Sequence, residues 1–251
     1  MSADSPGADW HSPAPYAPLA HCDRHGFAWE WLRRMQTYRT ACARQLTAAE
    51  ERRIAAQFGL HRLESPDLAW PQARPLWRRD IDSAVLEAEI APLTDGETID
   101  LRMLTTIASF DDDGHEEHWL FADHGHHVRI DVRTGSLNEG CVGLRFQIRG
   151  FPRCRAQLAS LDRLVALTEL GRWPARNPPP ERRAERWALM LRVHDAVASG
   201  ASHRAIAECL FDLGDLPRWR VTTPSWRRRV QRLAEAARQL ARAGSTIWLR
   251  S

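Results

Sequence analysis

The sequence contains no lysine, so all 35 of its fixed cationic side chains are arginines. It also lacks any run of ~18 apolar residues, the length that a membrane-spanning helix needs. A basic segment followed by an apolar core is missing near the N-terminus, so no secretory signal is expected. Five scattered cysteines without paired spacing exclude disulfide and zinc frameworks. We therefore expect a cytoplasmic protein with reduced thiols and no membrane contact.

Signatures of catalysis are also missing, since there is no Gly-rich phosphate loop, GxSxG or paired Cys–His arrangement. The densest group of potential metal ligands comprises His115, His118, His124, His126 and His127 with Asp111, Asp112, Asp113, Glu116 and Glu117. A metal site or hydrolytic centre is one interpretation. However, strand alternation would point neighbouring side chains to opposite faces. We favour a solvated polar hairpin, place Asp123 and Asp131 at the surface or in turns, and expect no enzyme, metal or cofactor.

Charge is distributed unevenly along the chain. Residues 1–144 hold 14 Arg against 23 Asp and Glu, a net charge of −9, whereas residues 145–251 hold 21 Arg against 9 acidic residues, a net charge of +12. From Leu216 onward there are nine Arg and a single acidic residue, Glu235. This asymmetry indicates that the second part of the chain meets a polyanion such as nucleic acid.

Helical patterns dominate the first sixty residues. After a proline-rich arm over residues 1–20, the stretch FAWEWLRRMQTYRT (Phe27–Thr40) has the aromatic density of a docking helix. A second helix is predicted from Thr47 to Phe58, with Glu50 completing a capping box.

The middle of the chain predicts a small, mostly antiparallel sheet. Prolines make the connection over residues 63–79 irregular. Strand-like segments separated by turn signals follow at 85–90, 99–109, 119–122, 128–132 and 142–148. A helix opens at Pro152 and runs to about Leu170, and the prolines of GRWPARNPPP after it mark a linker.

Three helices are expected after the linker, at residues 185–199, 202–211 and 223–244. Ser202 caps the second, and His194 lies on the buried stripe of the first as a core histidine. This order of helices, ending in a basic one, is that of a helix-turn-helix. The connection over 212–222 is longer than the usual three or four residues, and we expect Trp219 to anchor it in the core.

The last of these helices, TPSWRRRVQRLAEAARQLARAG, carries the strongest signal. Thr223 suits the N-cap, Pro224 the first helical position and Gly244 the stop. An apolar stripe is formed by Trp226, Val230, Leu233, Ala237 and Leu240. The opposite face and its margins hold Ser225, Arg227, Arg228, Gln231 and Arg232. Guanidinium groups bind phosphates and guanine edges, so this face suits a major-groove recognition helix; a solvated, arginine-rich surface helix is the alternative.

Two stretches resemble a proteobacterial family of regulators. AWEWLRRMQTYR, with Asp9, Trp10 and Tyr16 before it, resembles the family's N-terminal motif. SHRAIAECLF and the arginine-rich helix resemble its second domain, a variant helix-turn-helix. Members include RovC-like activators of type VI secretion genes, FseA-like activators of conjugative-element transfer and QseM-like antiactivators. The resemblance implies DNA-binding transcriptional regulation, and RovC-like members imply a homo-oligomer.

We therefore predict an α+β fold in three parts. A helical N-terminal arm covers residues 1–62, a core with the small sheet and a following helix covers 63–176, and the variant helix-turn-helix domain covers 181–251. The expected function is a sequence-specific bacterial transcriptional regulator, an activator of a mobile-element or secretion gene cluster. The alternative is a protein-interaction module or antiactivator of the same fold that does not bind DNA.

Two sets of contact residues follow from this interpretation. The DNA contacts predicted are Thr223, Ser225, Arg227, Arg228, Gln231 and Arg232, with His203 and Arg204 near phosphates. One recognition helix rarely reaches useful specificity alone, so we expect a homo-oligomer on double-stranded DNA, open to other regulator proteins. Its subunit contact is predicted at Trp29, Trp31 and Tyr38, unless this helix packs on its own subunit instead.

Overall fold

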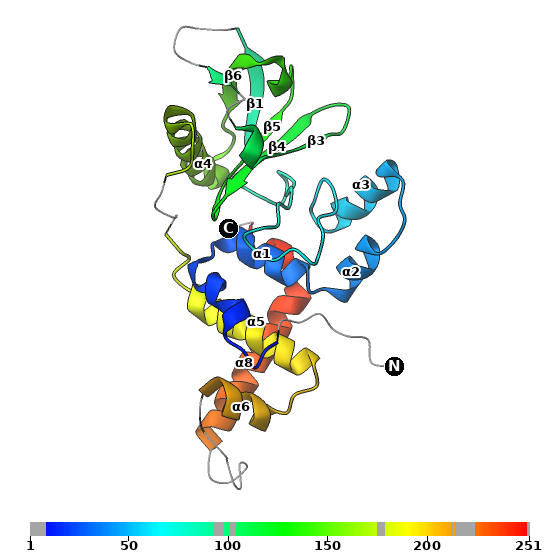
Figure 1. Cartoon of the computed structure of the whole chain (residues 1–251), viewed down its shortest axis with the longest axis vertical. Helices are drawn as coiled ribbons and strands as arrows, with labels where there is room; N and C mark the ends of the chain where they lie inside the picture. The colour runs from blue at the N-terminus through cyan, green and yellow to red at the C-terminus, as the bar shows by residue number, and fades with distance from the viewer. Residues whose placement is uncertain are drawn as a thin grey trace. The chain divides into compact units, whose positions relative to one another are not determined.

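The protein combines separate helices with one six-stranded sheet, which confirms the predicted α+β class (Figure 1). The structure is a computed structural model and describes residues 9–92, 98–100, 104–174, 179–211, 213 and 224–249. Its chain divides into two compact units. The helical unit holds residues 1–39 and 179–248, and the sheet unit holds residues 40–178 and 249–251. The division into residues 1–62, 63–176 and 181–251 stays a prediction.

The helical unit joins the two ends of the chain. Its elements are the 3-10 helix η1 (Ala14–His21), α1 (Arg24–Leu32), α5 (Ala184–Ala198), α6 (His203–Phe211), α8 (Pro224–Ala243) and η5 (Ser245–Trp248). Trp10 packs with side chains of α5, α6 and α8 in one hydrophobic cluster. A second aromatic group places the rings of Phe27 and Trp187 5.2 Å apart and those of Trp187 and Trp248 4.3 Å apart. The N-terminal segment and the C-terminal helices therefore share one core.

The prediction of one helix over Phe27–Thr40 is wrong. The chain forms α1 and then α2 (Gln36–Cys42), with a break between them. Trp29 lies in the last turn of α1, and its ring packs edge-on against Tyr38 of α2 with 5.9 Å between the ring centroids. Helical periodicity is a local signal, so it predicts neither the break nor the ring contact across it.

Several local predictions are confirmed. Helix α3 (Ala48–Gln57) begins after Thr47, whose hydroxyl accepts from the Glu50 N–H while Glu50 accepts from the Thr47 N–H, a complete capping box. Ser202 caps α6 by accepting from the Ala205 N–H at 3.1 Å. These caps depend on neighbouring residues alone, which is why the sequence shows them.

The sheet unit contains six strands in the order β2-β6-β1-β5-β4-β3. Their bounds are Leu86–Ala91 (β1), Ile99–Asp100 (β2), Ala108–Asp112 (β3), Glu117–Asp123 (β4), His126–Val132 (β5) and Cys141–Gln147 (β6). Only the β1–β5 pairing is parallel among the strands described, so the sheet is mostly antiparallel as predicted. The 3-10 helices η3 (Thr105–Ile107) and η4 (Leu137–Glu139) lie in its connections.

A single strand over 99–109 is a second wrong prediction. Strand β2 pairs with β6 at one edge of the sheet, whereas β3 pairs with β4 at the other. The stretch therefore contributes two short strands to opposite edges of the sheet. Hydrophobic alternation is a local signal and does not show which strand a segment pairs with.

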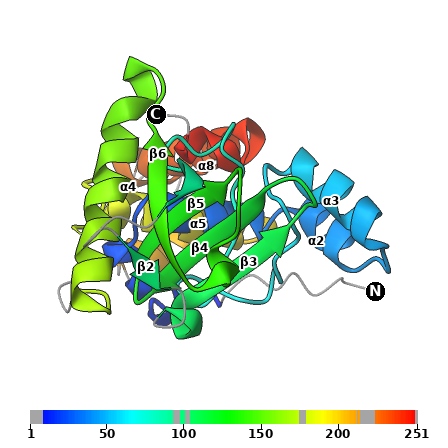
Figure 2. The ribbon, with the colours of Figure 1, turned by 90° about the horizontal axis from the view of Figure 1, so that it is seen from above.

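Helix α4 (Phe151–Leu170) packs on the sheet, as Figure 2 shows. Its residues Leu164 and Leu167 join Trp119, Phe121 and Ile130 in the main core of the unit. Pro152 stands in the first turn of this helix, as predicted. No helix in the described part of the chain is long and apolar enough to cross a membrane.

Candidate nucleic-acid interface

Helix α8 has one buried face and one exposed face. Val230, Ala234 and Ala237 are buried, and the helix packs on α5 and α6. It begins at Pro224 and ends before Gly244, whose φ of 81° is the left-handed conformation that ends helices. The stop signal is confirmed, and the predicted cap Thr223 lies outside the described residues.

The exposed face of α8 carries four of the predicted DNA contacts. Ser225, Arg228, Gln231 and Arg232 are all exposed. Arg227 is half-buried instead, and its Nε is enclosed without a hydrogen-bond partner among the described residues. It therefore lies on the inner margin of the helix, a place less suited to DNA than the prediction assumed. The remaining side chains form a polar row at the start of the helix that combines guanidinium and amide groups.

Arg229 is an exposed cation that the sequence analysis did not single out. Its guanidinium lies 4.5 Å from the ring centroid of Phe211 and 4.9 Å from that of Trp226. Contact with two aromatic rings restrains an arginine and orients it. Because Phe211 belongs to α6, only the tertiary packing of α6 on α8 creates this arrangement.

The start of α6 lies in the same unit but offers less charge than predicted. His203 is half-buried, and Arg204 is exposed. Arg204 Nε donates to Glu208 Oε1 at 2.6 Å, one helical turn later. A phosphate near Arg204 must therefore compete with this carboxylate.

A buried ionic network fixes α5, on which α8 packs. Arg34 donates to both carboxylate oxygens of Asp195 at 2.9 and 3.0 Å and also pairs with Glu30. Tyr16 donates to Asp195 at 2.7 Å, and Arg33 pairs with Glu30 at 2.9 Å. Burial opposes the charge on Arg34, yet the two carboxylates outweigh it and raise its pKa. Burial and the neighbouring Asp195 raise the pKa of Tyr16, so it stays a hydrogen-bond donor.

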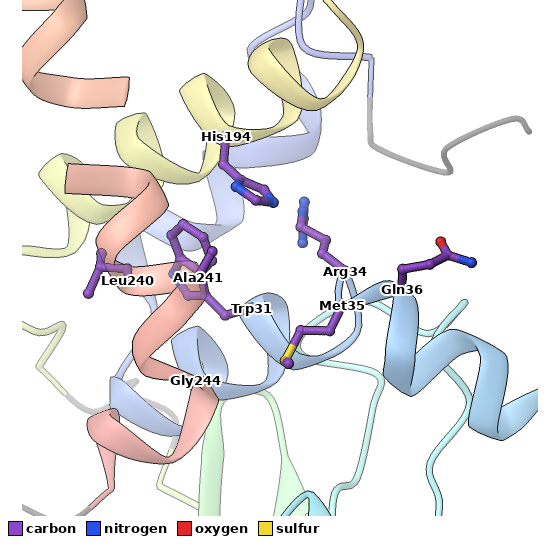
Figure 3. A pocket seen from close by; sticks show the side chains of 8 residues that line it. All are labelled: Trp31, Arg34, Met35, Gln36, His194, Leu240, Ala241 and Gly244. Atoms are coloured by element: carbon purple, nitrogen blue, oxygen red, sulfur yellow. The ribbon is translucent and has the colours of Figure 1, made fainter. Parts of the chain in front are cut away.

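A cavity of about 180 Å³ lies beside this network and near the end of α8. Figure 3 shows the ring of His194 and the guanidinium of Arg34 pointing toward the same space, with Leu240 and Ala241 of α8 on another side. Burial lowers the pKa of His194 and so disfavours the charged form of its ring. His194 is half-buried and its ring centroid lies 5.0 Å from that of Trp31, so it lines a cavity rather than filling the core.

The predicted subunit-contact residues are buried within the chain. Trp29 and Tyr38 are fully buried, and Trp31 is 3 % exposed. Their described ring contacts are to one another and to His194. These three side chains therefore offer no surface to a second copy in this structure, because the segment that carries them is part of the helical core.

The histidine- and acid-rich segment of the sheet unit is only partly the solvated hairpin predicted. His115 and His124 are exposed, but Glu117, His118, His126, His127 and Asp131 are buried. The prediction of a surface position for Asp131 is wrong, and Asp123 is half-buried. Arg129 donates to Asp131 at 2.8 Å and to the Trp77 and Trp119 carbonyls, so this strand face buries charge that its neighbours compensate.

Within this segment, His61, His118 and Asp131 have potential ligand atoms within 4.8 Å of one another. However, His118 already faces Asp131 at 2.9 Å through Nδ1 and Asp113 at 3.2 Å through Nε2. The His61 and His118 rings are stacked at 3.5 Å, so their in-plane lone pairs run side by side instead of converging. Burial acts against the charge of Asp131, but Arg129 and His118 still lower its pKa. The group is better suited to an internal ionic network than to a metal ion.

Comparison with known protein families assigns both ends of the chain. A model described as "T6SS, Transcription factor, DNA binding domain" matches residues 147–246, and one described as "Proteobacterial transcriptional regulator-like domain" matches residues 9–61. Among curated proteins, none matches the chain. The first match contains α4, α5, α6 and α8, so the exposed row of α8 lies inside a DNA-binding domain.

Proposed function

The chain belongs to the RovC-like family of transcriptional regulators, and on that premise we propose that α8 enters the major groove of a specific DNA site. The observation that carries this placement is the polar row Ser225, Arg228, Gln231 and Arg232, exposed on the first half of the helix. Its opposite face is held by α5 and α6. A helix fits the major groove, where arginine and glutamine read guanine and adenine edges.

Helices α5, α6 and α8 form a variant helix-turn-helix in this proposal. Gly200, with a φ of 83°, lies in the short turn between α5 and α6. The third helix then takes the recognition role, and the start of α6 lies toward the phosphates. The longer connection before α8 falls largely outside the described residues, as does Trp219.

The proposed role is activation of a bacterial secretion or mobile-element gene cluster. The matched domain description names a transcription factor of type VI secretion, which supports this class of target. Genome-wide mapping of bound DNA with matched transcript changes tests it. Deletion of the gene for this protein should reduce transcripts from the promoters that the protein binds. An increase in these transcripts on deletion would show that the protein is a repressor.

A salt titration separates DNA binding from the alternative of a pure interaction module. For a DNA binder, log K for a random duplex should fall with log salt by about 0.9 for each phosphate neutralised. An interaction module should show little duplex affinity even at low salt. Arginines on one exposed helix face favour the first outcome.

We also propose that the protein binds DNA as a homo-oligomer. A single recognition helix buries little surface, and symmetric copies place several helices on repeated half-sites. Because Trp29, Trp31 and Tyr38 are buried, the contact between copies must use other residues. Light scattering should show a mass that is a multiple of 28.6 kDa; a monomer at micromolar concentration with and without DNA would contradict it.

A further inference from the structure

Helix α4 exposes an unusual amount of apolar surface. Of the eight large hydrophobic residues exposed in the described part of the chain, four lie on this one helix: Phe151, Leu158, Val165 and Leu170. Phe151 is 97 % exposed. A concentration of this kind on one element marks an interaction site rather than scattered surface residues.

The exposed apolar residues follow a seven-residue repeat. Phe151, Leu158 and Val165 are separated by seven residues each, so they form one row along the helix. The opposite face of α4, including Leu164 and Leu167, is already buried against the sheet. Packing on the sheet therefore does not explain the outer row. Seven-residue spacing of exposed apolar side chains is the spacing of one core position in a packed helix pair.

Charges beside this row favour a second copy of the same helix as its partner. Arg155 and Asp162 are exposed, and each follows an apolar residue of the row by four positions. In an antiparallel pair related by a two-fold axis near Leu158, Arg155 of each copy faces Asp162 of the other. In a parallel pair, Arg155 and Asp162 would face the positions of Gly150 and Gln157, which carry no charge. The self-complementary pattern thus specifies an antiparallel orientation.

The surface next to Val165 provides a place for Phe151. A groove of about 390 Å³ lies between α4 and the sheet and is lined by Ile99, Leu144, Phe146, Leu161, Val165 and Thr168, among others. Phe151 and Val165 are 14 positions apart, about 21 Å along a helix. A two-fold axis near Leu158 brings Phe151 of one copy to Val165 of the other, beside this groove.

We propose that α4 pairs antiparallel with α4 of a second copy, each Phe151 entering the groove beside the other copy's Val165 and each Arg155 facing the other copy's Asp162. The contact is isologous, so the same surface serves both subunits. It rests on the proposed homo-oligomer and names the surface that forms it.

Exchange of the paired charges tests this contact. Arg155→Asp and Asp162→Arg each place two like-charged pairs in the dimer. Each should raise the dissociation constant of the dimer by at least about tenfold. The double variant, Arg155→Asp with Asp162→Arg, restores opposite charges and should return association to near the level of the unmodified chain. Analytical ultracentrifugation over a concentration series measures both effects, and circular dichroism melting checks that each variant is folded.

An apolar variant provides the second arm. Leu158→Glu should dissociate the pair, whereas Leu68→Glu, at another exposed leucine of the sheet unit, should not. A double charge variant as weak as the single ones, or an unchanged mass for Leu158→Glu, overturns the proposed pairing. If either of these outcomes occurs and the chain still forms oligomers, the homo-oligomer is supported and the α4 contact is rejected. A monomeric unmodified chain rejects both.

Discussion

Arg34 Nε lies 2.9 Å from Asp195 Oδ1, although 161 positions separate the two residues. Arg34 belongs to the segment that matches the proteobacterial regulator-like domain, and Asp195 belongs to the matched DNA-binding domain. The two matched segments thus meet in one buried ion pair. The N-terminal segment is therefore a structural part of the helical unit that contains α8.

Removal of this pair should destabilise the helical unit strongly. Arg34→Ala leaves Asp195 and Glu30 buried without their shared cation, which typically costs about 3–5 kcal/mol. Arg24→Ala provides a control, because its pair with Glu181 is more exposed and should contribute at most about 1 kcal/mol. Urea unfolding measures both. Equal effects of the two substitutions would show that the Arg34 network does not hold the unit together.

The polar row of α8 should account for specific DNA recognition. Arg228→Ala should cost about 1–3 kcal/mol on a specific site if this side chain reads a guanine, and Arg232→Ala should add to it. Arg242→Ala removes the same charge from the last turn of the same helix and serves as the control. Titrations on specific and random duplexes measure the losses. An unchanged footprint and affinity for the double variant Arg228→Ala, Arg232→Ala would place the interface elsewhere.

Glu208 should weaken DNA binding by pairing with Arg204. Glu208→Gln removes the carboxylate 2.6 Å from Arg204 Nε, so affinity for random duplex should rise. The slope of log K against log salt concentration should become steeper by up to about 0.9, the value for one further phosphate contact. Glu235→Gln is the matched control, since Glu235 pairs with Arg238 farther along α8. If the two variants respond alike, the effect is one of net charge, and Arg204 is not near a phosphate.

The sheet unit should lose stability as the pH falls below about 6.5. Burial, and next the charge of Arg129, lowers the pKa of His61 to about 3. An unfolded histidine titrates near 6.5, so between these values the unfolded chain binds a proton that the folded chain does not. The contribution of His61 to the free energy of unfolding is fully present above pH ~6.5 and is lost as the pH falls toward about 3.

Replacement of this ring measures the effect. His61→Phe keeps an aromatic ring against His118 and removes the titrating group. Between pH 7.5 and pH 5, the unmodified chain should lose about 2 kcal/mol more unfolding free energy than the variant. Chemical unfolding at the two pH values gives the comparison. Parallel losses in both chains would mean that other groups dominate the acid sensitivity.

Local signals in the sequence determined much of the helical architecture. Thr47 with Glu50, Ser202 and Gly244 marked helix ends correctly, because caps and stops depend on residues within a few positions of one another. The exposed row of α8 was also predictable, since Arg228 and Arg232 lie one turn apart and opposite the apolar stripe. Each of these features is a property of one helix.

The tertiary structure alone decided which polar and aromatic side chains are buried. Trp29 and Tyr38 belong to an aromatic stretch that predicted an exposed docking surface. Their rings instead pack against each other across the break between α1 and α2. Asp131 and His118 belong to a segment whose composition predicted a solvated hairpin, yet both lie in a buried network with Arg129. Residues outside the sheet, His61 and Trp77 among them, pack against this network and bury it. Burial depends on what packs from distant parts of the chain, and a one-dimensional pattern does not contain that information.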